Sequence, residues 1–344
     1  MNSDIITFGE IMLRLSPPNF KRFSQSNSFD VTYGGAEANV AVSLANFGFK
    51  VSFVTKIPQN DIGESCIQYL NKYNVKTKYV RRGGERLGIY FLEKGTTVRS
   101  SKVIYDRTNS SVSTVNIFEF DWDKIFQNAR WFHWTGITPA LSQNLADIIL
   151  QAIKKAKEFG LMVSCDLNYR SKLWNYGKNP SEIMKNLMKY CDIVVGNEED
   201  FDKVFGIIPS HVNISSGEIS GQKYEPVSKV FFKRFPNVSY IAITLRGSIS
   251  ATHNIWTGIL FDKFKMYEAP LYDLTYIVDR VGSGDAFNAG LIYGFFKKMD
   301  LQKILEFAVA ASCLKHTIEG DFNLVSIDEV EKLINGNISG RIVR

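Results

Sequence analysis

Hydrophobic and polar positions alternate in a regular way along most of the chain. Short runs rich in β-branched and aromatic residues are followed by longer amphipathic segments with helical spacing. The short runs predict strands at residues 5–8, 51–55, 162–166, 193–195 and 240–245. The amphipathic segments predict helices at residues 36–47, 62–72, 145–159, 286–297 and 301–317. This order is typical of an α/β protein, in which helices cover both faces of a mostly parallel central sheet.

Two stretches, residues 13–33 and 76–105, depart from this pattern. β-prone residues recur in them without a long helical segment, and Gly83-Gly84 and Gly95 are suited to tight turns. We expect a second, smaller sheet here, although a pair of surface hairpins would have the same periodicity. The polar residues 207–226 predict a long surface loop. The whole chain, residues 1–344, is thus expected to form one α/β domain with a small accessory β-sheet.

Composition and charge exclude several classes of protein. Charged residues make up 22% and hydrophobic residues 45% of the chain, which argues against extended disorder. The net charge of +6 is modest and basic residues are interspersed with acidic ones, so nucleic acid is not an expected partner. The scattered cysteines form no Cys-x-x-Cys pair, which disfavours a disulfide framework and a structural metal site. Without an export leader or an apolar run of about 20 residues, we expect a cytoplasmic protein that does not enter a membrane.

The most informative segment is residues 279–290, which pass from a strand-like run through a glycine turn into an apolar helix. Gly282 and Gly284 allow the backbone to approach a ligand closely, and the free amides at a helix start bind phosphate oxygens. Asp285 stands at this helix start. It is either a helix cap, for which aspartate is favoured, or a base that takes a proton from a hydroxyl attacking a phosphoryl group. The segment alone does not separate the two interpretations.

Asp279 and the run Gly282-Ser283-Gly284-Asp285 match a motif, Asp-x-x-Gly-Ala/Ser-Gly-Asp, of the ribokinase or phosphofructokinase-B family of carbohydrate kinases. The chain resembles this family in a second place, where Gly34-Gly35 precede a helix that bears Asn39. The resemblance implies a ribokinase-like fold with the small sheet as a lid, and ATP and Mg²⁺ as cofactors. It also implies that Asp285 is the catalytic base and that the amides of Gly282, Ser283 and Gly284 form an anion hole.

Two further segments resemble nucleotide-binding elements of the same family. Asn197 and the acids after it resemble an Asn-x-x-Glu element that organises magnesium and phosphate, with either Glu199 or Asp200 as the acid concerned. A solvated helix start rich in acids is the alternative. The segment that contains Thr244, Arg246 and Gly247 resembles the strand and glycine turn that receive ATP phosphates in this family. The resemblance also suggests a monovalent cation near the turn, where Arg280 replaces the threonine of many relatives.

Arginines and tyrosines in the small sheet and in the centre of the chain suit an acidic sugar. Arginine binds a carboxylate with two prongs, and tyrosine hydroxyls bind keto or hydroxyl oxygens. In this respect the chain is similar to 2-keto-3-deoxygluconate kinases. The similarity implies a substrate pocket lined by Gly34, Gly35, Asn39, Tyr90, Tyr105, Arg107, Arg170, Asp285 and Asp321. Taken singly, such a tyrosine is usually a packing residue and such an arginine a surface charge.

The resemblance therefore implies ATP-dependent phosphorylation of 2-keto-3-deoxygluconate to its 6-phosphate. A fructokinase or ribokinase that acts on a neutral sugar is the second hypothesis, and a non-catalytic regulator that binds sugar or nucleotide is the third. The sequence does not distinguish the gluconate epimer from the galactonate epimer. Because exposed lid strands can pair between subunits, we expect a homo-oligomer. The aromatic residues 131–134 are assigned to the core, with no ligand role for His133.

Overall fold

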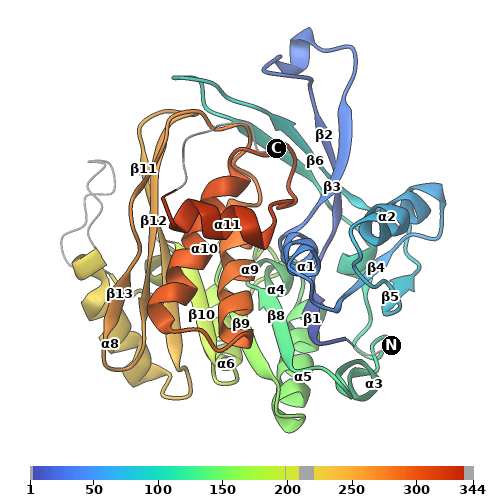
Figure 1. Ribbon diagram of the computed structural model, residues 1–344. Coiled ribbons are helices and arrows are strands. Elements are labelled where there is room, and N and C mark those ends of the chain that lie inside the picture. The colour runs from blue at the N-terminus through green and yellow to red at the C-terminus, as the bar shows by residue number, and fades with distance from the viewer. Residues whose placement is uncertain (1–2, 198, 209–220, 337–344) are drawn as a thin grey trace.

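The structure, a computed structural model, describes residues 3–197, 199–208 and 221–336 and contains a ten-stranded central sheet in that part of the chain (Figure 1). In spatial order its strands are β13 (Met266–Glu268), β12 (Asn254–Phe261), β11 (Tyr240–Ser248), β10 (Ile193–Asn197), β9 (Met162–Asp166), β8 (Trp131–Thr135), β1 (Ile5–Phe8), β4 (Val51–Ile57) and β5 (Val80–Arg82), with β14 (Tyr272–Leu274) paired to β12. The neighbours from β11 to β5 are all parallel, and β12 to β14 are antiparallel. The mostly parallel sheet is therefore confirmed.

Helices cover both faces of the central sheet, as Figure 1 shows. They are α1 (Ala36–Asn46), α2 (Asp61–Lys72), α3 (Trp122–Phe126), α4 (Ile137–Leu141), α5 (Gln143–Glu158), α6 (Pro180–Met188), α7 (Asp200–Phe205), α8 (Glu225–Arg234), α9 (Ser283–Phe296), α10 (Leu301–Lys315) and α11 (Ile327–Ile334). One core packs α1, α9 and α10 against the sheet, and a second packs α5, α6 and α8 against the other face. Consecutive strand residues alternate between these cores: Trp131 lies in the first and Phe132 in the second. Both faces of the strands are therefore hydrophobic.

The predicted strands and helices are all present, and the differences at their ends affect the cavity described below. β10 and β11 extend beyond the predicted ends, and α9 begins three residues before the predicted residue 286. The aromatic residues 131–134 are confirmed as core, and burial lowers the pKa of His133 to about 3. Of the predicted loop at residues 207–226, residues 209–220 lie outside the described residues. The predicted end of this loop is wrong, because a short 3-10 helix, Gly221–Tyr224, leads directly into α8.

A separate four-stranded sheet projects from one edge of the central layer, at the top right of Figure 1. Its order is β3 (Asp30–Gly34), β2 (Met12–Ser16), β6 (Gly88–Glu93) and β7 (Lys102–Asp106). The second sheet expected from residues 13–33 and 76–105 is thus present, and the hairpin alternative is wrong. One part of the expectation fails: β5 belongs to the central sheet, because Val80 pairs in parallel with Thr55 of β4.

Buried charges attach the small sheet to the body of the protein. Arg14 of β2 bonds through separate nitrogens to Asp279 at 2.5 Å and to Asp321 at 2.7 Å, and all three side chains are at most 3% exposed. Tyr90 of β6 donates its hydroxyl to the same Asp321 at 2.5 Å. Gly34 of β3 approaches so closely that a Cβ there would lie 2.0 Å from Asp321 Oδ2, which explains why glycine is needed at this position. Three strands of the small sheet therefore converge on one carboxylate.

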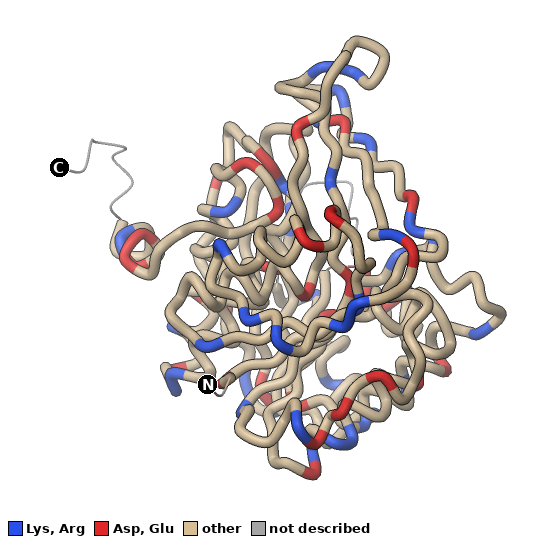
Figure 2. Tube along the Cα trace, turned by 90° about the vertical axis from the view of Figure 1, so that its right-hand side faces the viewer, with Lys and Arg blue, Asp and Glu red and all other residues tan. Residues whose placement is uncertain are grey.

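In the part of the chain that the structure describes, basic and acidic residues are interspersed, as the second view shows (Figure 2). This agrees with the interspersed charges of the sequence. Within the residues that the structure describes, no helix is both long and apolar enough to span a bilayer.

Replacement of Arg14 by methionine is expected to destabilise the fold strongly. Arg14→Met leaves two buried carboxylates without their cation, which typically costs about 3–5 kcal/mol of unfolding free energy. Arg82→Met is the control, because Arg82 pairs with Glu64 at 3.0 Å while both side chains are substantially exposed, and such pairs contribute about 0–1 kcal/mol. Urea unfolding measures both values. Equal losses in the two variants would contradict the attachment of the small sheet by buried charge.

Candidate active site

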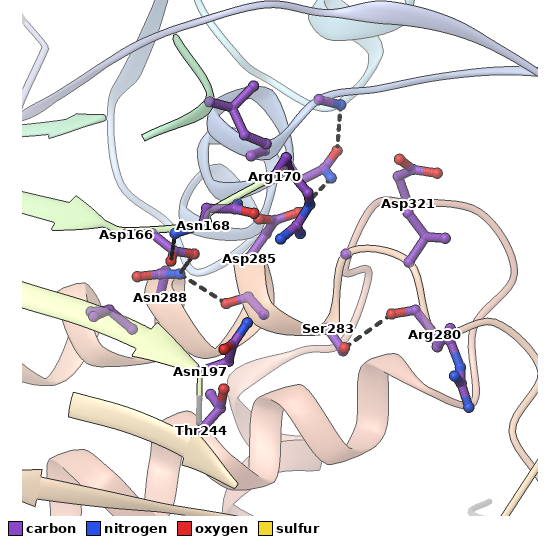
Figure 3. A pocket seen from close by; sticks show the side chains of 18 of the residues that line it. Asp166, Asn168, Arg170, Asn197, Thr244, Arg280, Ser283, Asp285, Asn288 and Asp321 are labelled. Carbon is purple, nitrogen blue, oxygen red and sulfur yellow. Dashed lines mark hydrogen bonds between the residues drawn. The ribbon is translucent and has the colours of Figure 1, made fainter. Parts of the chain in front are cut away.

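A cavity of about 350 Å³ lies between the small sheet and the carboxyl ends of β9, β10 and β11 (Figure 3). Ligands of open α/β sheets bind at this end of the strands. Most of the residues singled out from the sequence line it, namely Gly35, Asn39, Tyr90, Tyr105, Arg107, Arg170, Asn197, Asp200, Thr244, Arg246, Gly282, Ser283, Gly284, Asp285 and Asp321. Gly34, Glu199 and Gly247 are not among its lining residues. The structure thus brings together the two motifs from opposite ends of the chain.

The glycine turn before α9 opens directly to this cavity. Gly282 has a φ of +83°, and a Cβ there would lie 1.9 Å from the carbonyl oxygen of Asp321, so glycine is required for two reasons. At Gly284 a Cβ would meet no atom within 4 Å, so the backbone is accessible from the cavity. Ser312 donates its hydroxyl to the carbonyl of Ser283 at 2.7 Å and fixes the turn from behind. The first amides of this 14-residue helix have no partner within the helix and suit an anion.

Asp285 lies in the first turn of α9 but does not cap the helix. The cap is Gly282, which makes no side-chain capping bond. The Asp285 carboxylate, 9% exposed, instead accepts a hydrogen bond of 2.6 Å from the Asn39 amide nitrogen. Burial raises the pKa of Asp285 to about 7; Asp321 and Glu37 add to the rise, whereas the Asn39 hydrogen bond and Arg170 oppose it. A carboxylate that titrates near neutrality is suited to accept a proton.

Asn39 connects the two motifs. While its amide nitrogen donates to Asp285, its amide oxygen accepts from the backbone nitrogen of Gly35 at 3.2 Å. Asn39 is 2% exposed, so its orientation is fixed by these two bonds. Its observed contacts orient the carboxylate of Asp285.

A second acidic residue, Asp166, was not singled out from the sequence, although it ends a predicted strand. Its carboxylate accepts from the Asn288 side chain at 2.8 Å and from the backbone nitrogen of Asn168 at 3.1 Å. Figure 3 shows Asp166 and Asn288 side by side near Asp285. Burial raises the pKa of Asp166 well above its usual range, and the nearby carboxylates of Asp200 and Asp285 raise it further. This cavity therefore accumulates negative charge that a cation would neutralise.

The acids that follow Asn197 differ in their access to the cavity. Asp200 is 3% exposed, lines the cavity, and accepts from the backbone nitrogens of Asn197 at 2.9 Å and Tyr169 at 3.0 Å. Burial raises its pKa. Glu199 is exposed and does not line the cavity. The geometry therefore favours Asp200 over Glu199 as the acid that faces a ligand.

The donor set fits magnesium that is bound together with phosphates. Within the described ranges, no group of three or more His, Cys, Asp or Glu side chains could hold a metal ion. Magnesium usually takes only one or two protein carboxylates and completes its shell with water and substrate phosphates. The carboxylates of Asp166 and Asp200 are compatible with such a site, because burial raises the pKa of both and a divalent cation would favour their charged forms.

The two arginines expected to bind a substrate carboxylate have different surroundings. Arg107 donates through Nε to Glu10 at 2.9 Å, and Ser110 holds the same Glu10 at 2.6 Å. The Arg107 guanidinium also lies 5.4 Å from the ring centre of Tyr105, which is half exposed. Arg170 is exposed in the cavity and donates to the backbone carbonyl of Tyr169 at 2.8 Å. Arg170 is thus the more accessible of the two cations. The pairing of Arg107 with Glu10 could not be inferred from the sequence.

The expected glycine turn after Thr244 is wrong. β11 continues to Ser248, and Gly247 pairs with Ile255 of β12 within the sheet. Thr244 and Arg246 still line the cavity, because alternate residues of a strand share one face. Arg280, whose role the sequence left open, lines the same region and donates to the carbonyl of Ala251 at 3.0 Å. Burial lowers the pKa of Arg280 and the like charge of Arg246 lowers it further, so this end of the cavity favours an anion.

Comparisons with known proteins agree with this geometry. The family described as pfkB family carbohydrate kinase matches residues 2–213 and 261–325. A solved 2-dehydro-3-deoxygluconokinase from Thermotoga maritima is 49% identical, with a TM-score of 0.92 over 96% of this chain and 99% of that one. The 2-dehydro-3-deoxygalactonokinase of Haloferax volcanii is 31% identical and covers 99% of both chains, and the 2-dehydro-3-deoxygluconokinase of Bacillus subtilis is 28% identical over 94% of this chain and 92% of its own. The chain therefore belongs to the pfkB family of carbohydrate kinases, and it is a sugar kinase with the ribokinase-like fold.

Proposed function

We propose that this sugar kinase transfers the γ-phosphoryl group of ATP to the C6 hydroxyl of 2-keto-3-deoxygluconate. The observation that carries the proposal is the position of Asp285: a buried carboxylate whose pKa is raised to about 7, at the amide-rich start of α9, in a cavity that Arg107 and Arg170 also line. The names of the relatives from Thermotoga maritima and Haloferax volcanii, both kinases of 2-dehydro-3-deoxy acid sugars, support this substrate class.

Asp285 would act as the base of the reaction. As the sugar oxygen forms a bond to the γ-phosphorus, the bond from that phosphorus to the oxygen of the departing ADP breaks, and the hydroxyl proton passes to Asp285. The amides of Gly282, Ser283 and Gly284 would stabilise the negative charge on the transferring group, because they are fixed before the reaction begins. Asn39 keeps the carboxylate of Asp285 directed into the cavity.

The nucleotide phosphates would lie toward Thr244, Arg246 and Arg280, where the like-charged guanidiniums favour an anion. Magnesium, when bound with them, neutralises phosphate charge. Asn197, Asp200 and Asp166 are the residues we propose to hold it, with Glu199 more remote.

Recognition of an acidic sugar would depend on Arg170 and on Arg107, whose guanidinium is oriented by its bond to Glu10. A single arginine can make a planar, two-pronged contact to a carboxylate. A neutral sugar, the substrate of the fructokinase or ribokinase alternative, has no carboxylate to pair with Arg170. The epimer is undetermined by these contacts, because two epimers differ in the direction of one hydroxyl.

The small sheet is proposed to close over the substrates and exclude water, so that ATP is not hydrolysed. Its outer strands expose Val31, Val103 and Ile104, each at least 38% exposed. Such apolar strands favour pairing with a second copy of the chain, which supports the expected homo-oligomer.

The substrate proposal predicts a clear order of sugars. In a coupled ATP-consumption assay, kcat/KM for 2-keto-3-deoxygluconate or its galacto epimer should exceed that for fructose and ribose by about 100-fold or more, because a site built for a polar group rejects ligands that lack it. Equal values for fructose would exclude the acid-sugar assignment while leaving the family membership intact.

The base is tested by Asp285→Asn, which keeps the shape of the side chain and removes its proton affinity. We expect kcat to fall by about 10²- to 10⁴-fold, with the dissociation constants of both ligands nearly unchanged by calorimetry. Asp328→Asn is the matched control, since Asp328 occupies the first turn of α11 and is exposed. Full turnover by the Asp285 variant would refute the mechanism.

The pH dependence follows from the raised pKa of Asp285. Protonated Asp285 cannot accept a proton, so kcat/KM should fall as the pH decreases through about 7 and level off above it. The hydrogen bond from Asn39 lowers the pKa of Asp285. Its loss in Asn39→Ala should therefore move the inflection to higher pH. An inflection that stays in place would assign the titration to another acid of the cavity, such as Asp166.

A further inference from the structure

Lys315, the last residue of α10, is a charged side chain with no solvent exposure. Lysine is almost never fully buried unless a partner stabilises its charge. Its ammonium donates to two backbone carbonyls, that of Ile318 at 3.1 Å and that of Asp279 at 3.4 Å. In the part of the chain that the structure describes, none of the salt bridges includes Lys315. The ammonium is therefore held by carbonyl dipoles inside the protein.

The two carbonyls belong to the two segments that shape the phosphate-binding turn. Asp279 begins the run that ends at Asp285, and Ile318 precedes Asp321, whose carbonyl lies against Gly282. Other bonds join the same segments: the backbone nitrogen of Val278 donates to the carbonyl of His316 at 2.9 Å. The end of α10 thus packs beneath the turn, and the ammonium of Lys315 lies between the two segments.

The charge of Lys315 also balances the network under the cavity. Asp279 and Asp321 are two buried carboxylates, and Arg14 supplies only one positive charge between them. Lys315 supplies a second cation opposite these two carboxylates. Burial lowers the pKa of Lys315, whereas Asp279, Asp321 and Asp285 favour its charged form. Without it, an uncompensated negative charge would remain below a turn that is meant to receive phosphate. Such a charge would weaken anion binding, since burial limits its screening.

We propose that Lys315 is a positioning residue for phosphoryl transfer, a built-in cation that fixes the carbonyls beneath the Gly282–Asp285 turn in place of a dissolved monovalent ion. The inference rests on the proposed role of this turn. Backbone carbonyls are also the ligands that replace the hydration shell of K⁺. Activity of the unmodified protein should then be independent of monovalent cations, contrary to the cation that the family resemblance suggested.

The test compares Lys315→Met with the unmodified protein in potassium chloride and in tetramethylammonium chloride, whose cation is too large for the site. The unmodified protein should have the same kcat in both salts. The variant should lose about 10- to 100-fold of kcat in tetramethylammonium, as expected for a displaced catalytic turn, and regain part of it in K⁺ or NH₄⁺. Lys56→Met is the matched control, because Lys56 is half-buried, pairs with Glu119 at 2.7 Å and does not line the cavity.

Two results would overturn the inference: activation of the unmodified protein by K⁺, or a Lys315→Met variant whose kcat is the same in the two salts. Should Lys315→Met fail to fold, Lys315→Gln retains a donor for the carbonyls without the charge, and its kcat is compared in the same way. The assay uses whichever sugar the protein phosphorylates, so a different substrate would refute the proposed function without affecting this comparison.

Discussion

Two buried carboxylates, Asp279 and Asp321, set the main physical constraint on this molecule. Each is nearly inaccessible to water, and a buried charge is tolerated only when it is paired. Arg14 of the small sheet opposes both, and it remains charged because these carboxylates outweigh the cost of its burial and raise its pKa. Since Asp279 begins the segment that leads into the Gly282–Asp285 turn and Asp321 packs against this turn, one ionic network connects the small sheet, the turn and the loop after α10. Movement of any of the three disturbs the others.

The position of Asp285 depends on the same connection between the small sheet and the turn. Asp285 follows the turn in sequence, and its carboxylate is held by Asn39 from the helix that follows β3 of the small sheet. The proposed base is therefore oriented by residues from both ends of the chain. Burial of this carboxylate, with smaller contributions from Asp321 and Glu37, raises the pKa of Asp285 to about 7, where the carboxylate can both accept and release a proton.

The sequence predicted those features that have a local pattern. Hydrophobic periodicity located the strands, and short motifs located Asn39 and Asp285, because glycine turns and helix starts are encoded within a few residues. Arg14 and Lys315 were missed: Arg14 pairs with Asp321, 307 residues away, and Lys315 contacts backbone atoms. The contact of Arg107 with Glu10 was also not predicted, because it joins residues 97 positions apart and leaves no local pattern. The expected turn at Gly247 failed because sheet pairing with β12 overrode the preference of glycine for a turn.

We propose that one cavity holds a sugar hydroxyl between the carboxylate of Asp285 and the nucleotide phosphate at the start of α9. The decisive measurement is a crystal structure with 2-keto-3-deoxygluconate and a non-hydrolysable ATP analogue. The C6 hydroxyl should lie within about 2.6–3.2 Å of the Asp285 carboxylate, with the terminal phosphate against the amides of the turn. A sugar bound with C6 away from Asp285, or a phosphate bound elsewhere, would contradict it.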